Sequence, residues 1–448
     1  MMVAQCSHFR RAGGAAALLC LLALSGCATR GDLQARIQSD LGRRQPDEAV
    51  AQLHKATVRD TDRVLYLLDD GMLLHLAGRW RESNDSFEAA QRLMVQLSAL
   101  SLREQGTSLL VNDYTRSYEG EPYDKVMLHV YKALNYLALG QPFDARVEAL
   151  QLDQEFRALA EKSGKQDPEL GFPRYLTGMI YEQLGEWSDA MIAYRKAYEA
   201  YQRHEQAYGV PVPEDLKREL MRMARHEGLR DELEQYRKTF GRDNEADDFP
   251  PPGSPGSADG EVVLVFNAGL APYKGEHSVA VPDPGSGRLI RISLPYMMRR
   301  IPQARAARLE AGARTARTQR VEDIGAVAAA DLEDRMPGIT ARSVARIIAK
   351  KQVEDRAAHD NPLAGFLLNV AAVVTEVADT RSWTTLPDNI QLARLALAPG
   401  RYDLKIEVLD DAGRVVGEDA FPGVAVRAEA KTFISYYWSP STLPGVSP

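Results

Sequence analysis

The chain has 448 residues, which are too many for one hydrophobic core and suit two or three domains. A hydrophobic content of 45% and a charged content of 26% are those of an ordinary globular protein, which excludes wholesale disorder, collagen-like repeats and a polytopic membrane protein. The formal net charge of −7 gives no indication of a nucleic-acid partner.

Residues 1–26 have the pattern of a secretory signal. Arg10 and Arg11 form a short basic region, and an uncharged apolar run follows at 15–24. The run is too short for a lasting membrane span, and the motif Leu-Ser-Gly-Cys that ends at Cys27 is typical of bacterial lipoproteins. We therefore expect cleavage before Cys27 and lipidation of its sulfur, in preference to a plain secretory signal in which this cysteine is incidental.

The expected anchor predicts where the protein resides. Three acyl chains hold a protein firmly on a membrane, where one chain would be marginal. Because Ala28 and not aspartate follows Cys27, similarity to Gram-negative lipoproteins favours the periplasmic face of the outer membrane. The other two cysteines, Cys6 and Cys20, would leave with the signal, so we expect no disulfide and no cysteine metal ligand in the mature chain.

Small and aromatic residues repeat through residues 27–240. A motif of small, large and small residues that begins at Ala49 recurs at Ser83, and the offset of 34 residues is the tetratricopeptide period. Glycines that follow apolar or aromatic segments mark the helix turns: Gly78, Gly140, Gly185 and Gly228. The pattern predicts an all-α tetratricopeptide-like solenoid, interrupted at 99–124, rather than an ordinary helical domain with chance matches.

Stacked helix pairs form a curved array with a concave groove, and such grooves bind peptides or protein segments. We expect four side chains of the first helices to line the groove: Lys132, Asn135, Tyr136 and Tyr181. The insertion at 103–123 carries aromatic residues and is expected to be a loop packed over the array. The alternative is a lid over the groove.

Residues 241–260 are rich in acids, prolines and glycines and are predicted to be a linker. Runs typical of strands follow, separated by turn formers, at 261–266, 288–294, 390–397, 402–409, 415–416, 424–426 and 432–438. The alternation at 304–321 is too loose to identify an element and favours a strand only weakly. Helical patterns at 323–335 and 340–352 are expected to be split by Met336-Pro337-Gly338. Residues 261–448 are thus predicted to be an α+β domain with a mainly antiparallel sheet.

Residues 362–379 form the most apolar stretch after the signal, yet the stretch is too short and too polar to span a membrane. We expect a buried helix packed on the sheet, and the alternative is a helix that meets the membrane or a partner. The seven arginines within 299–320 are expected to lie on a solvated face. No aromatic residues alternate with them, so they do not indicate nucleic-acid binding.

The sequence holds no recognisable catalytic, nucleotide-binding or metal-binding motif, so we expect no catalytic residue, no metal and no cofactor. The histidines after the signal are scattered, without a pair spaced for a metal on one helix face. A hydrolase with an unfamiliar site is left as an alternative, which a cluster of partly buried acids would support.

Two loops of the second half carry candidate binding residues. Lys274 and Glu276 follow the first predicted strand, where binding loops often lie. Arg381 and Trp383 lie together between a predicted helix and strand, a combination that suits a planar or anionic group. The alternative for these loops is a structural corner in which Trp383 is buried and Arg381 bonds backbone carbonyls.

Three segments resemble an uncharacterised family of proteobacterial outer-membrane lipoproteins: 129–140 (HVYKALNYLALG), the Tyr-x-Gly-x-x-Tyr motif at 118–123, and 379–387 (DTRSWTTLP). The resemblance covers most of the chain after the signal. It implies a tetratricopeptide-like first half, a β-rich second half and a role in the cell envelope. It implies no established activity.

These observations predict a lipid-anchored, periplasmic scaffold for protein interactions in cell-envelope assembly. The expected partners are the membrane, through the anchor, and envelope proteins such as the peptidoglycan synthesis or export machinery. The alternative is a glycan- or peptidoglycan-binding module that uses the loop of Arg381 and Trp383.

Overall fold

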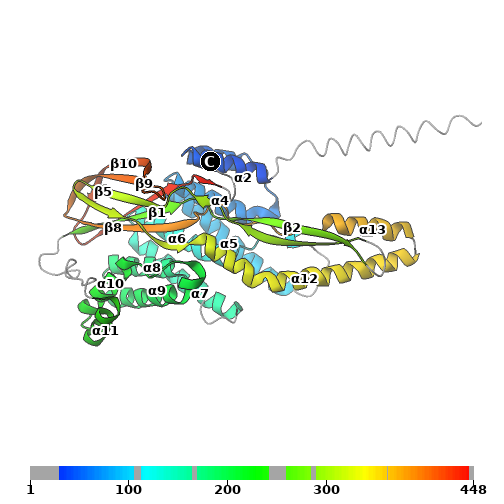
Figure 1. Ribbon diagram of the computed structural model, residues 1–448, viewed down its shortest axis with the longest axis horizontal. Coiled ribbons are helices and arrows are strands. Elements are labelled where there is room, and N and C mark those ends of the chain that lie inside the picture. Colours follow the sequence, from blue (N-terminus) through cyan, green and yellow to red (C-terminus); the bar gives the residue numbers. More distant parts are fainter. Residues whose placement is uncertain are drawn as a thin grey trace, which may run out of the picture. The chain divides into compact units, whose positions relative to one another are not determined.

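The computed structural model describes residues 30–104, 113–163, 169–241, 259–283, 289–360 and 362–442. These residues belong to two compact units, Met1–Ala56 and Thr57–Pro448 (Figure 1). The predicted signal, Cys27 and most of the predicted linker lie outside the described residues. The structure differs from the predicted division at 241–260, because the helical half from Thr57 onward and the strand-rich half form one unit.

The first unit is a helix pair, α2 (Arg30–Gly42) and α3 (Pro46–His54). The second unit begins with four further pairs: α4 (Arg63–Leu76) and α5 (Trp80–Glu104), α6 (Pro122–Ala138) and α7 (Pro142–Ser163), α8 (Gly171–Gln183) and α9 (Trp187–Tyr208), and α10 (Glu214–His226) and α11 (Arg230–Phe240). These helices confirm the predicted all-α tetratricopeptide-like half. We call helices α4 to α11 of the second unit the repeat half.

Glycines build the pairs in two ways. Gly78 and Gly185 have φ angles of +73° and +72°, a left-handed conformation that ends α4 and α8 at the predicted turns. Within α8, Gly178 lets the ring of Tyr194 approach so closely that an added Cβ would lie 2.3 Å from it. Gly71 of α4 lies against Phe87 of α5 in the same way, so in these two pairs a small residue of the first helix sets the distance to the second helix.

The second half contains two four-stranded sheets. Sheet 1 has the order β11-β1-β8-β7 and sheet 2 the order β10-β9-β5-β6. Their strands are β1 (Gly260–Ala268), β5 (Ala306–Ala311), β6 (Arg314–Arg317), β7 (Gln319–Asp323), β8 (Asn389–Leu397), β9 (Gly400–Leu409), β10 (Val415–Val426) and β11 (Lys431–Trp438). All pairings within them are antiparallel except that of β1 with β11, which confirms the predicted α+β half with mainly antiparallel sheets.

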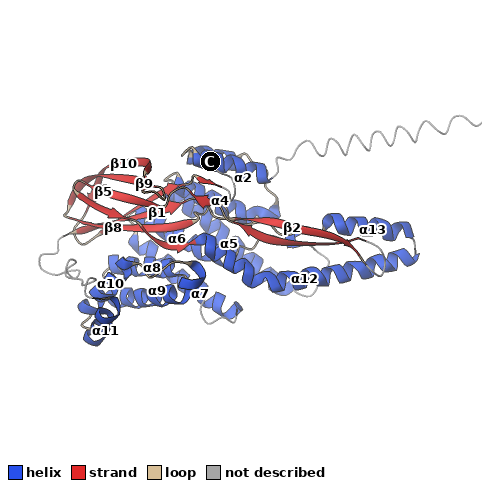
Figure 2. Ribbon diagram, in the orientation of Figure 1, coloured by secondary structure: helices blue, strands red, loops and turns tan. Residues whose placement is uncertain are grey.

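The two faces of sheet 1 belong to different cores. Val263 and Val265 of β1 join the core that the repeat helices form, whereas Leu264 and Phe266 join the core against sheet 2. Because a strand alternates its side chains, the uninterrupted apolar run of β1 means burial on both faces. The second unit is therefore layered as repeat helices, sheet 1 and sheet 2, and Figure 2 shows helices α8, α9, α10 and α11 below the strands.

A projecting arm consists of a strand ribbon and two helices (Figure 1). Strands β2 (Tyr273–Pro282) and β3 (Leu289–Met298) pair with each other, and α12 (Ile324–Asp360) and α13 (Pro362–Thr375) pack on β3 and on each other. A short ribbon of β4 (Ile301–Pro302) and β12 (Ser441–Thr442) completes the strands described.

Two predictions about the arm are wrong. The helices expected at 323–335 and 340–352 are one helix, α12, with Pro337 inside it. Proline removes one backbone hydrogen bond of the helix. In the turn before it, Arg335 pairs with Asp331 of the same helix and with Glu121 of the repeat half. The helix expected at 362–379 does form, as α13, but it is not buried on a sheet, since much of its apolar surface is exposed.

Candidate functional site

The inner face of the repeat half is covered by sheet 1. His75 of α4 bonds to Ser435 of β11 (Nε2 to Oγ, 2.8 Å), and the Tyr131 hydroxyl of α6 donates to Asn267 of β1 at 2.8 Å. The hydroxyl of Tyr201 donates to the carbonyl of Val321 at 2.8 Å. The concave surface that was expected to hold a protein partner is thus occupied by the second half of the same chain.

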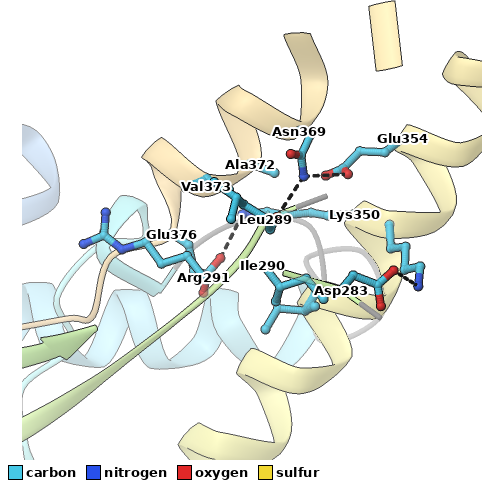
Figure 3. A pocket seen from close by; sticks show the side chains of 12 residues that line it. Asp283, Leu289, Ile290, Arg291, Lys350, Glu354, Asn369, Ala372, Val373 and Glu376 are labelled. Atoms are coloured by element: carbon cyan, nitrogen blue, oxygen red, sulfur yellow. Dashed lines mark hydrogen bonds and ion pairs between the residues drawn. The ribbon is translucent and has the colours of Figure 1, made fainter. Parts of the chain in front are cut away.

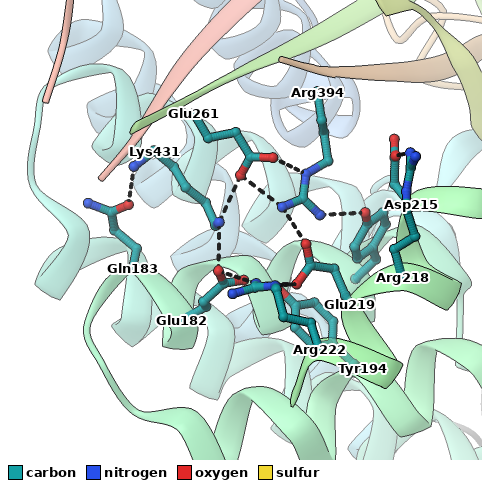
Figure 4. A network of polar contacts seen from close by, with 11 residues as sticks. Glu182, Gln183, Tyr194, Asp215, Arg218, Glu219, Arg222, Glu261, Arg394 and Lys431 are labelled. Atoms are coloured by element: carbon teal, nitrogen blue, oxygen red, sulfur yellow. Dashed lines mark hydrogen bonds and ion pairs between the residues drawn. The ribbon is translucent and has the colours of Figure 1, made fainter. Parts of the chain in front are cut away.

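A closed ring of six charged side chains joins the halves (Figure 4). It alternates in sign around its circumference: Glu182, Arg222, Glu219, Arg394, Glu261 and Lys431. Helices α8 and α10 supply three members, and strands β8, β1 and β11 supply the others. We call it the charge ring.

The charge ring is buried and electrically balanced. Arg394 binds both carboxylate oxygens of Glu261 at 2.6 and 2.8 Å and lies 2.6 Å from Glu219. Burial alone would raise the pKa of Glu182, but Arg222 and Lys431 outweigh it and hold that pKa far below its usual range. The arrangement is a structural ion network, because each charge is already neutralised by two neighbours.

The burial of Lys132 and Asn135 corrects their expected position in an open groove. Lys132 Nζ lies 2.9 Å from Glu148 and 2.8 Å from Glu88, so this lysine joins α6 to α5 and α7. The Asn135 amide group donates to Ser83 and Asn84, both at 2.8 Å. These side chains hold helices together, because their partners lie on the neighbouring helices α5 and α7.

The other two expected groove residues lie nearer the surface. Tyr136 is half-buried beside the repeat core. Tyr181 is largely buried, and the guanidinium of Arg146 stacks over its ring at 5.8 Å. Tyr136 lies close enough to Lys132 and Glu148 for their charges to act on its hydroxyl. The partner binding of both tyrosines stays a prediction.

Arg381 and Trp383 form the structural corner that was the alternative interpretation. The Arg381 guanidinium bonds Asp379 at 2.9 and 2.7 Å and donates to the carbonyls of Thr61 and Arg116 at 3.1 and 2.8 Å. Trp383 has 0% of its surface exposed. A glycan cannot reach a ring with no exposed surface, so burial argues against the predicted binding role of this loop.

The described part of the 103–123 insertion is packed rather than open. The backbone amide of Tyr118 donates to Thr61 at 2.8 Å, and the side chains of Tyr118 and Tyr123 are buried. Residues 105–112 lie outside the described residues. The part that is described favours the packed loop over the lid.

Lys274 and Glu276 are also held in place. Lys274 is buried against Glu121 of the repeat half, and Glu276 pairs with Arg291 at 2.8 Å. Lys274 thereby joins a buried acid cluster that we define as Glu121, Asp124 and Asp331. A cluster of acids was the feature expected of a hydrolase, but Glu121 is neutralised by Lys274 and Arg335, as in a structural network.

Asp124 makes this cluster sensitive to pH. Burial, with the charge of Glu121 beside it, raises the pKa of Asp124 to about 7. The Asp124 Oδ2 atom accepts hydrogen bonds from the Tyr118 hydroxyl at 2.6 Å and from the Glu121 amide at 2.9 Å. Since the carboxyl is easier to protonate in the folded chain than in the unfolded chain, its stabilising effect is present at acidic pH and is lost as pH rises towards 7.

Replacing Asp124 with asparagine should flatten this dependence. Asparagine keeps an acceptor for both hydrogen bonds and does not ionise. From pH 5 to pH 8 the wild-type free energy of unfolding should fall by about 2 kcal/mol more than that of Asp124→Asn. Urea unfolding at the two pH values measures the difference, with Glu234→Gln on the exposed face of α11 as the control. Equal pH dependence of wild type and Asp124→Asn would contradict the prediction.

Inside the arm, polar side chains are paired around a small pocket between β3, α12 and α13 (Figure 3). Glu376 lies 3.1 Å from Arg346 and 2.8 Å from Lys350, and Lys351 lies 2.6 Å from Asp283. Asn369, the asparagine of α13, donates to the Leu289 carbonyl at 2.9 Å. The pocket is narrow and its polar groups are used within the arm, so it offers little to a ligand.

Among the exposed apolar side chains of the described residues, two groups follow one face of a helix, and the first of them fits the alternative given for 362–379. One is the outer face of α13, which we call the α13 face: Leu363, Phe366, Leu367 and Val370. The other is the α7 stripe: Phe143, Val147 and Leu150. Both follow helical spacing. The spacing is visible in the sequence, but it looks the same as that of a buried face.

Two features are absent from the described residues. None of the described helices has both the length and the apolar character that crossing a membrane requires. No group of three or more histidine, cysteine, aspartate or glutamate residues in the described chain is arranged to hold a metal ion.

No protein-family model matches the chain, and no curated protein matches it. The resemblance to a lipoprotein family therefore gains no support from these comparisons. Solved structures do match. The crystal structure of MamA has a TM-score of 0.30 and 15% identity over 48% of this chain and 93% of its own. MamA 41-end from Desulfovibrio magneticus RS-1 has a TM-score of 0.29 and 16% identity over the same shares. A Podosopora anserina putative kinesin light chain with nearly identical TPR-like repeats has a TM-score of 0.31 and 18% identity over 48% and 97%.

Proposed function

We propose that this chain is a lipid-anchored scaffold of the cell envelope that binds a protein partner on the outer side of its repeat half. Cys27 would hold the chain on the periplasmic face of the outer membrane, as its lipobox suggests. The partner would belong to the envelope machinery, such as that for peptidoglycan synthesis or export.

The α7 stripe is the observation that carries this proposal. The inner face of the repeat half is already filled, so a partner needs another surface. Phe143 has 73% of its surface exposed, and Val147 and Leu150 continue the same face over two helical turns. Exposed apolar surface of this kind marks an interaction site.

The surroundings of the stripe favour a protein as its occupant. The exposed Asp144 and Gln154 and the half-exposed Arg146 lie on the same helix. An apolar centre with charged and polar groups around it is the ordinary anatomy of a protein–protein interface. An amphipathic helix or an extended segment of the partner would cover the apolar centre and bond the polar groups beside it.

Crosslinking in intact cells tests the proposal. A photoreactive residue placed at Gln154 should crosslink envelope proteins that mass spectrometry then identifies. Adding Phe143→Asp and Val147→Asp should lower that yield at least ten-fold, whereas the matched control Ile192→Asp, an exposed apolar position on α9, should not. Equal yields from the stripe variant and the wild type would refute the proposed surface.

The anchor is tested separately. Mass spectrometry of the purified chain should find acyl groups on Cys27, and Cys27→Ser should remove them and weaken membrane association. A wild-type chain that carries no acyl group would contradict lipid anchoring, whatever the crosslinking shows.

A further inference from the structure

The α13 face differs from the α7 stripe in having no polar surroundings on its own helix. Helix α13 contains no aspartate, glutamate, lysine or arginine across its 14 residues. Leu363, Phe366 and Leu367 have 64%, 61% and 58% of their surfaces exposed, and Val370 has 44%. The spacing i, i+3, i+4, i+7 puts these four side chains on one face.

The polar side chains of α13 bond within the arm. Asn369 donates to the Leu289 carbonyl and, at 3.1 Å, to Glu354 of α12. Thr375 returns its hydroxyl to the carbonyl of Ala371 at 2.8 Å. The outer face therefore presents apolar groups with no need of a hydrogen-bonding partner. A protein–protein interface ordinarily has polar groups around its apolar centre, whereas a surface that contacts the hydrocarbon of a bilayer needs none.

Exposed basic residues on the neighbouring helix favour an anionic surface. Residues 342–356 of α12 contain five basic residues and two acidic ones, and three of the five, Arg346, Lys350 and Lys351, are paired within the arm with Glu376 and Asp283. Arg342 and Arg356 are exposed at either end of this segment. Apolar side chains on one side with basic residues nearby are the signature of helices that lie in the headgroup region of a membrane.

From these observations we propose that the arm lies on a lipid bilayer containing anionic headgroups, with the α13 face sunk into the boundary between headgroups and acyl chains. A helix of 14 residues is about 21 Å long, short of a hydrocarbon core of about 30 Å, so α13 lies along the surface and does not cross it. The inference adds a second membrane contact to the proposed anchor and rests on the proposed membrane location.

Depth-dependent quenching tests the inference on the full, lipid-anchored chain. Phe366→Trp places a fluorophore on the α13 face, and Phe143→Trp places one on the α7 stripe as the matched control. In vesicles of phosphatidylethanolamine and phosphatidylglycerol with brominated acyl chains, the emission added by Trp at 366 should fall at least two-fold. The emission added by Trp at 143 should change by less than a tenth.

A second variant checks that the apolar face causes the effect. Adding Leu367→Glu and Val370→Glu to Phe366→Trp should abolish the quenching. These positions are exposed, so folding should be preserved, as circular dichroism will show. Replacing phosphatidylglycerol with phosphatidylcholine should weaken the quenching.

Three results would overturn the inference. The first is an unquenched fluorophore at 366 on chains that float with the vesicles. The second is equal quenching at 366 and 143. The third is a lipid-independent emission shift at 366 that grows with protein concentration, which would assign the face to a second copy of the chain. Failure of the anchor looks different, because flotation would then be the same for Cys27→Ser and the wild type.

Discussion

Replacing Arg394 with leucine is expected to lower the free energy of unfolding by about 3–5 kcal/mol. The substitution opens the charge ring and leaves Glu261 and Glu219 buried without their shared cation. It also removes a hydrogen bond to the Tyr175 hydroxyl, 3.0 Å from Nη1. Removing one member of a buried network costs far more than the network contributes net, because the remaining charges cannot return to water.

Denaturant unfolding of the full chain measures this loss. The matched control is Arg308→Leu, since Arg308 pairs with Glu407 but has 41% of its side chain exposed, and the loss of this solvent-screened pair should cost far less than that of Arg394. Arg394→Lys keeps the charge and should fall between the two, which provides a folded variant if leucine prevents folding. A cost for Arg394→Leu no larger than that of the control would refute the role of the ring.

Trp383→Ala removes a buried indole ring and should lower the free energy of unfolding by about 3–5 kcal/mol. The ring is fully buried and packs edge-on against Phe87 with centroids 5.8 Å apart. Its Nε1 atom donates to Thr385 Oγ1 at 2.9 Å, and Thr385 donates in turn to Asp69 of α4 at 2.9 Å. Alanine would leave a cavity and break this connection between the halves.

Trp383→Phe separates packing from hydrogen bonding. Phenylalanine fills most of the volume but loses the donor, so the cost should be about 1–2 kcal/mol. Thermal and urea unfolding compare the two variants. The fraction of folded Trp383→Phe chain that sediments with purified sacculi should equal that of the wild type. A selective loss of sedimentation would restore the binding role that burial argues against.

Local patterns predicted the elements well. The turn glycines Gly78 and Gly185 predicted the ends of helices because a left-handed turn is a local requirement. The apolar run at β1 predicted a strand for a similar reason. The contacts between the two halves could not be predicted in this way. Glu182, Glu261 and Arg394 are far apart in the sequence, and no spacing rule indicates that they lie together.

The site predictions failed where two distant surfaces meet. Lys132 and Asn135 are polar residues on a first helix, and the sequence does not show that this helix is covered from both sides. For α13 the error was reversed. Burial of apolar surface is the dominant favourable term in folding, so a strongly apolar segment predicts an interior position. No local sequence feature distinguishes an apolar helix that the protein itself buries from one that remains exposed to a membrane.

The parallel pairing of β1 with β11 has a consequence for how the chain matures. Residues 261–268 find their neighbours at 431–438, so sheet 1 lacks an edge strand until the end of the chain is present. Because the chain is synthesised from its amino terminus, the repeat helices are made before β11, and their apolar inner side stays exposed until sheet 1 is complete. A chain that terminates before residue 431 is therefore expected to aggregate and to be degraded by proteases, and not to function as a shorter protein.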